Sequence, residues 1–237
     1  MWKDCTLSRI EIILIVTATA LAGVLTPAMS SADAPLMTNV NVINNDAGGS
    51  KQEFPSLTVA IAPDNTLYAV WADYRHPGRP GMISTSTDRG QTWGDGIRNN
   101  NDRLIGAGYS MAKPYITRGD DGTLYLTYYT ERGLEIGPTL VRFIKSSDNG
   151  NRWTTPVLAS DPGQKSTNAT APDGSIYVAT SFCEAGGCGL FLTKSTDSGR
   201  TFTRIYQNDM GALPVVRVDG NGTVNLLWTQ ITSLSPF

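Results

Sequence analysis

The sequence contains little of what zinc proteins and nucleic-acid-binding proteins rely on. It has one histidine and three cysteines among 237 residues, with 19 basic residues, 21 acidic residues and a formal net charge of −2. One histidine and so few cysteines form a poor ligand set for zinc, and Ser-His-Asp catalysis would depend wholly on His76. The near-neutral charge and the lack of a lysine- or arginine-rich run disfavour nucleic acid as a partner. We therefore expect no metal, no cofactor and no nucleic-acid partner.

Long apolar runs are absent except near the N-terminus. Residues 12–25 (IILIVTATALAGVL) form an apolar run that is followed by small residues at positions 28–32. The run is shorter than the ~20 residues that a bilayer span needs, and the pattern is typical of an export signal with its cleavage zone. We predict a signal peptide over residues 1–31 and a secreted or periplasmic protein that does not stay in the membrane. An uncleaved anchor is the alternative.

Two cysteines remain once a signal peptide containing Cys5 is removed. Cys183 and Cys188 flank a Gly-Gly pair in FCEAGGCG, between two strand-like runs. An oxidising compartment would preserve a disulfide across this turn. We predict the Cys183–Cys188 disulfide, with two free thiols as the alternative.

A sustained helical period is also missing, and two repeated phrases take its place. A hairpin phrase, with a turn of Asp, Asn and Gly before alternating apolar positions, occurs at residues 62–71, 119–128, 171–180 and 219–228. About 25 residues after each of the first three turns comes the phrase Ser-x-Asp-x-Gly-x-x-aromatic. Its residues are Ser86, Asp88, Gly90 and Trp93, then Ser146, Asp148, Gly150 and Trp153, then Ser195, Asp197, Gly199 and Phe202.

The period of roughly 50 residues indicates a repeated unit of about four short strands, which is the size of a propeller blade. We predict an all-β β-propeller over residues 35–237. If the strands of a blade are called A to D, the A–B turns and the C–D phrases lie on one edge. The B–C loops and D–A connections lie on the opposite edge, as a binding surface on a rigid scaffold would. The segments expected there are residues 72–81, 94–114, 130–138 and 181–189.

The three Ser-x-Asp-x-Gly-x-x-aromatic phrases resemble the Asp boxes, or bacterial neuraminidase repeats, of the sialidase superfamily. The resemblance extends from about residue 50 to the end, and it implies a six-bladed propeller whose boxes are structural turns away from the active site. The residue types agree, because the Asp can bind backbone amides of its own turn and the Gly can adopt a positive φ. Three and a half blades are expected in this chain, as an N-terminal fragment of a longer protein. The alternative is a four-bladed ring completed by residues 38–43.

The resemblance also implies glycan chemistry, in which arginines hold a substrate carboxylate and an Asp and a Tyr act on the glycosidic bond. Within LYAVWADYR, Arg75 corresponds to one of these arginines and Asp73 to its companion. A structural ion pair between the two is the alternative. Glu53 stands where the family has another arginine, and no carboxylate lies between residues 76 and 87 for the acid/base role. This segment is therefore expected to lack sialidase activity by itself.

Three further charged residues are candidate ligand-binding groups on the same edge: Glu131, Arg132 and Glu184. Glu131 and Glu184 would form the carboxylate pair of a glycoside hydrolase that acts on other sugars, and solvated loop charges are the alternative. Packing rather than sugar stacking is expected for Trp71, Tyr128, Tyr129 and Trp228. The leading hypothesis is an exported propeller that binds or processes glycans. The rival is a non-catalytic scaffold that binds a protein or a carbohydrate.

Overall fold

The computed structural model describes residues 58–72, 81–94, 97–99, 109–132, 139–184 and 187–230. All of them belong to one compact unit, residues 41–237. Within these residues, no helix is long and apolar enough to cross a membrane.

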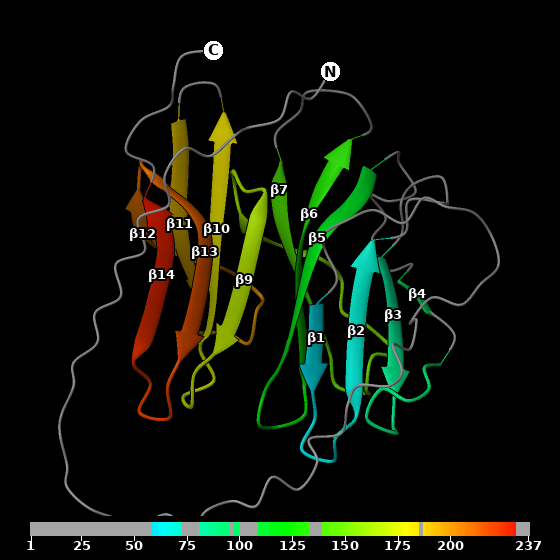
Figure 1. The fold of residues 1–237 in the computed structure, drawn as a ribbon. Coiled ribbons are helices and arrows are strands. Elements are labelled where there is room, and N and C mark those ends of the chain that lie inside the picture. Colours follow the sequence, from blue (N-terminus) through cyan, green and yellow to red (C-terminus); the bar gives the residue numbers. More distant parts are fainter. Residues whose placement is uncertain are drawn as a thin grey trace, which may run out of the picture. The chain divides into compact units, whose positions relative to one another are not determined.

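The chain forms three four-stranded antiparallel sheets and one two-stranded sheet, which are the blades of an all-β β-propeller (Figure 1). Blade 1 contains β1 (Thr58–Ile61), β2 (Leu67–Ala72), β3 (Gly81–Ser86) and β4 (Ile97–Asn99). Blade 2 contains β5 (Tyr109–Arg118), β6 (Leu124–Arg132), β7 (Leu140–Ser146) and β8 (Val157–Ser160). Blade 3 contains β9 (Lys165–Thr170), β10 (Ile176–Glu184), β11 (Gly187–Ser195) and β12 (Thr203–Asn208). The described part of blade 4 contains β13 (Gly211–Val218) and β14 (Val224–Gln230).

The core lies between the blades, because successive residues of a strand point to opposite faces of its sheet. On β6, Leu126 and Tyr128 pack in one buried cluster with Val70 and Ile83 of blade 1. Tyr129 lies on the other face of β6, in a second buried cluster with residues of blade 3. Burying an apolar side chain of this size stabilises the fold by roughly 1.5–3 kcal/mol. Each central blade therefore contributes apolar side chains to two interfaces.

Side-chain hydrogen bonds also connect the first strands of neighbouring blades. The hydroxyl oxygen of Thr58 on β1 accepts a hydrogen bond from the Ile116 N–H (3.0 Å), and the hydroxyl donates to the Pro114 carbonyl (3.3 Å). Thr167 on β9 accepts in the same way from the N–H of Val216 on β13 (3.0 Å). These bonds satisfy backbone groups that the β-bulges of β5 and β13 leave out of their own ladders.

The junction between blades 2 and 3 is built differently, around Asn168 of β9. This side chain is fully buried, and its amide donates to the Tyr115 carbonyl (3.1 Å) and to the Thr127 hydroxyl oxygen (3.2 Å). Its amide oxygen accepts a hydrogen bond from the Thr117 hydroxyl. Buried amides are expensive to leave unpaired, so this network makes the junction specific as well as stable.

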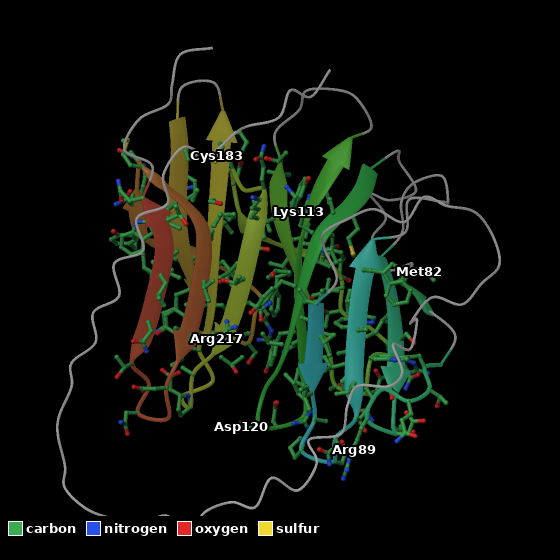
Figure 2. The ribbon with its side chains drawn as sticks, in the orientation of Figure 1. Met82, Arg89, Lys113, Asp120, Cys183 and Arg217 are labelled. Carbon is green, nitrogen blue, oxygen red and sulfur yellow. A yellow bond between two sulfur atoms is a disulfide. The ribbon has the colours of Figure 1, made fainter. Side chains whose placement is uncertain are left out.

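The strand register confirms the predicted arrangement of turns. The first residue of the second strand pairs with the serine of the Asp box in each complete blade: Leu67 with Ser86, Leu124 with Ser146, and Ile176 with Ser195. The A–B turn and the Asp box of a blade therefore lie at the same edge, which we call the box edge. We call the opposite edge the loop edge; there the second strand of each complete blade ends and the first strand of each blade begins. Figure 2 shows Arg89 and Asp120 at the box edge and Cys183 at the loop edge.

Two expected loops are wrong in extent. Residues 94–114 were expected to form one long connection, but β4 and the beginning of β5 lie within them. Residues 181–189 form a continuous hairpin up to Glu184 and again from Gly187, rather than an extended loop. In both places pairing with the neighbouring strand satisfies backbone groups, whereas local composition alone indicated a loop.

Candidate functional site

Each Asp box is a turn closed by its own hydrogen bonds. In the first box, Asp88 accepts hydrogen bonds from the Ser86 hydroxyl (2.7 Å), the Thr92 N–H (2.8 Å) and the Thr92 hydroxyl (2.6 Å). The Ser86 oxygen accepts one from the Gly90 N–H (2.8 Å). The corresponding bonds in the other boxes run from Ser146 to Asp148, Gly150 to Ser146, Ser195 to Asp197, and Gly199 to Ser195. The boxes therefore use their carboxylates for the turn itself.

These hydrogen bonds keep the box carboxylates ionised. The Thr92 hydroxyl and N–H lower the pKa of Asp88 to about 2. The pKa of Asp197 is lowered chiefly by the Thr201 hydroxyl, and that of Asp148 is lowered as well. A general acid must hold a proton near the working pH, and these groups do not. We conclude that the boxes are structural joints rather than catalytic groups.

The box glycines and aromatic residues attach each box to the interface between blades. Gly150 and Gly199 both have positive φ, 86° and 83°. A side chain at Gly150 would come within 2.9 Å of Ile83 in blade 1, and one at Gly199 would overlap the ring of Phe143 in blade 2. Phe202 of the third box packs edge-on against Phe143, with ring centroids 5.1 Å apart. The second and third boxes thus hold their blades against the preceding ones.

The loop edge carries three of the predicted ligand-binding residues. Glu131 and Arg132 are the last two residues of β6, where their backbones pair with Ser110 and Tyr109 of β5. Glu184 is the last residue of β10. The structure therefore brings these three positions to one edge of the sheets, opposite the boxes. Asp73, Arg75 and His76 lie outside the described residues, directly after the end of β2.

Polar side chains between blades 2 and 3 lie close to the same edge. The hydroxyls of Ser160 on β8 and Thr180 on β10 are 3.0 Å apart, and both side chains are buried. Ser166 pairs with Thr180 across the sheet, and its buried hydroxyl has no hydrogen-bond partner among the described residues. An unpaired buried hydroxyl can bond to water or to a ligand hydroxyl. This position was not found from the sequence, because one serine in a strand carries no distinguishing signal.

Positive charge also lies toward the loop edge. Lys113 follows the first residues of β5, and its amino group lies 5.2 Å from the centre of the Tyr129 ring. Lys165 is exposed at the start of β9. The box edge instead carries a carboxylate in every A–B turn and every Asp box, at Asp64, Asp88, Asp121, Asp148, Asp173, Asp197 and Asp219. The two edges therefore differ in charge as well as in loop structure.

A disulfide joins Cys183 and Cys188 at the loop edge of blade 3. The two residues are paired directly across β10 and β11, with Cα atoms 4.0 Å apart. The bond closes the hairpin immediately next to Glu184, so it restricts the backbone that carries this candidate residue.

The aromatic residues singled out from the sequence follow the packing expectation in part. Tyr128 and Tyr129 are buried between blades, as expected. Trp71 is half-buried. Trp228 is exposed instead, with its ring 6.2 Å from that of Tyr206, because the described part of blade 4 has no third strand to cover it.

No metal site is found in the part of the chain that the structure describes, since no three His, Cys, Asp or Glu side chains converge there. The polar groups that this part of the chain brings to the loop edge and its surroundings are carboxylates, an arginine, lysines and hydroxyls.

Comparison with known proteins gives structural matches only. No family model matches the sequence, and no curated protein matches it. A solved structure of a Hadza microbial sialidase matches 75% of this chain and 46% of its own, with a TM-score of 0.54 and 17% identity. A protein of unknown function from Dyadobacter fermentans matches 73% of this chain and 56% of its own, with a TM-score of 0.55 and 16% identity.

A family 117 glycoside hydrolase from the marine bacterium Zobellia galactanivorans matches 75% of this chain and 68% of its own, with a TM-score of 0.51 and 16% identity. This chain thus spans about half the length of the sialidase and of the Dyadobacter protein. The fold is shared. At these identities the likeness establishes the fold alone, and any activity depends on the residues that this chain itself places at a site.

Proposed function

We propose that this chain is part of an exported β-propeller that binds or processes glycans, with the glycan held at the loop edge. The observation that carries the proposal is the division of labour between the two edges. At the box edge the Asp-box carboxylates are tied into turns, whereas the loop edge collects Glu131, Arg132 and Glu184 from successive blades.

The residue types at the loop edge suit a sugar ligand. Carboxylates can accept hydrogen bonds from sugar hydroxyls or exchange a proton with a glycosidic oxygen, and an arginine can hold an acidic sugar through two parallel hydrogen bonds. Glu131 and Glu184 are the proposed acid/base pair, and Arg132 with Arg75 supplies positive charge. Two of the structural matches, a sialidase and a family 117 glycoside hydrolase, support a glycan as the ligand class.

Export is proposed on two separate features. The apolar run at residues 12–25 has the length of a signal peptide's central region. The Cys183–Cys188 disulfide supports an oxidising destination, because cytosolic thiols are kept reduced.

A panel of fluorogenic glycosides that includes a sialoside tests the proposal. Purified 237-residue protein is assayed beside Glu131→Gln and Glu184→Gln, with Asp120→Asn as the matched control at the box edge. If the two glutamates are acid and base, each substitution lowers kcat/KM by roughly 10²–10⁴-fold, while Asp120→Asn leaves it unchanged. Binding without turnover would favour the scaffold function. Neither turnover nor binding across the panel would contradict the proposal.

A further inference from the structure

The described blades end in two exposed apolar surfaces. On blade 4, Val215 and Leu227 point away from blade 3 and are 39% and 60% exposed. On blade 1, Val59 and Ile61 point away from blade 2 and are 44% and 65% exposed. We call these the blade 4 surface and the blade 1 surface. Exposed apolar surfaces of this kind on a folded chain mark interaction sites.

The strand register shows which interior residues correspond to the exposed ones. Thr127 is the fourth residue of β6, and Leu227 is the fourth residue of β14. Asn168 pairs with the third residue of β10, and Val59 pairs with the third residue of β2. Leu227 is thus the repeat equivalent of Thr127, and Val59 is the equivalent of Asn168.

These equivalent positions are in direct contact inside the molecule. At the junction of blades 2 and 3, the Asn168 amide donates a 3.2 Å hydrogen bond to the Thr127 hydroxyl oxygen. A junction between the blade 4 surface and a blade 1 surface would place Leu227 against Val59 in the same way. The polar pair of the interior junction has been replaced by an apolar pair on both sides at once, which keeps the two surfaces complementary. Replacing only one side would have left a buried amide or hydroxyl unsatisfied.

The first strands show the same alternation. The strands β1 and β9 carry the threonines that bond to a bulge in the next blade, and β5 and β13 carry those bulges, before Pro114 and Pro214. Blades 1 and 3 are therefore of one type, and blades 2 and 4 are of the other. A blade of the second type is followed by one of the first type at the junction of blades 2 and 3. By the same rule, the blade 4 surface matches a blade 1 surface.

We propose that the blade 4 surface packs against the blade 1 surface of a second copy of this chain, head to tail. The two surfaces of one copy do not meet each other, since Val59 and Leu227 are both exposed. A contact between unlike surfaces closes into a ring when the rotation allows it, and two copies then form two identical junctions. This assembly is independent of the glycan ligand and extends the inter-blade packing of the single chain.

Sedimentation measurements on the 237-residue protein test the proposal, together with Val59→Asp and Leu227→Asp. The wild type is expected to self-associate, and each aspartate is expected to weaken association by at least about tenfold. Both side chains are exposed, so circular dichroism and the melting temperature should stay those of the wild type. Each variant keeps one intact surface. An equimolar mixture of the two is therefore expected to form a 1:1 complex through one good junction.

A double-mutant cycle provides a second readout. Val59→Asn and Leu227→Thr each weaken association alone, and together they restore it by recreating the interior Asn–Thr pair. A wild type that stays monomeric at about 100 µM would overturn the proposal, and so would a mixture of the aspartate variants that does not associate. Strictly additive effects of Val59→Asn and Leu227→Thr would also overturn it, because the two residues would then not be in contact.

Discussion

Gly199 of the third Asp box offers a sharp test of the packing between blades. Gly199 has a φ of 83°, and a Cβ atom there would overlap the ring of Phe143, which is fully buried in blade 2. Gly199→Ala therefore has two penalties. The left-handed conformation costs about 1–2 kcal/mol for a residue with a side chain, and overpacking a rigid interface costs about 1–3 kcal/mol. Their sum, about 2–5 kcal/mol, is a large part of the 5–15 kcal/mol typical of a folded domain.

The matched control is Gly174→Ala in the same blade. Gly174 has a φ of 80°, and a Cβ atom there would meet nothing within 4 Å, so only the conformational penalty of about 1–2 kcal/mol applies. Urea unfolding followed by tryptophan fluorescence measures both variants against the wild type, with the midpoint compared at equal slope. If Gly199→Ala and Gly174→Ala differ by less than about 0.5 kcal/mol, the box does not press against Phe143 and the reasoning is refuted.

Three further outcomes are expected. Because hydrogen bonds lower the pKa of Asp88 from 3.8 to about 2, its contribution to stability is present above pH 3.8 and is lost as the pH falls toward 2; acid unfolding that is unchanged in Asp88→Asn would contradict this. Asn168→Ala leaves its buried partners unsatisfied and should destabilise the fold by about 1–3 kcal/mol in urea unfolding, against a near-neutral result if the network is unimportant. The tryptic peptide that contains Cys183 and Cys188 should be about 2 Da lighter without reduction than after it, and equal masses would show free thiols.

The blades could be predicted because their signals are local. An Asp- or Asn-containing turn followed by alternating apolar residues specifies a hairpin within about ten positions, and the period of roughly 50 residues specifies the blade. The direction of the turns followed from antiparallel pairing alone. Strand ends were less accurate: β10 continues to Glu184 and β5 begins at Tyr109, where the composition had indicated loops.

The junctions between blades could not be predicted, because they depend on residues far apart in sequence. Lys113 and Leu213 adopt positive φ, which neither residue type favours, because the first strand must bulge to meet the threonine of the previous blade. Asn168 begins a glycosylation sequon in the sequence, yet it is a fully buried network residue. At the candidate site, the order in which strands end predicted that Glu131 and Glu184 share an edge. The side-chain arrangement there depends on loop conformations that no local pattern specifies.

Hydrogen exchange with and without a bound glycoside tests the central claim most directly, namely that ligands bind at the loop edge while the boxes serve as joints. With a glycoside that binds in the panel, we predict slower exchange in peptides covering residues 130–138 and 181–189. The box peptides, residues 84–93, 145–153 and 194–202, should exchange at the same rate in both states. Protection confined to the box peptides would contradict the account.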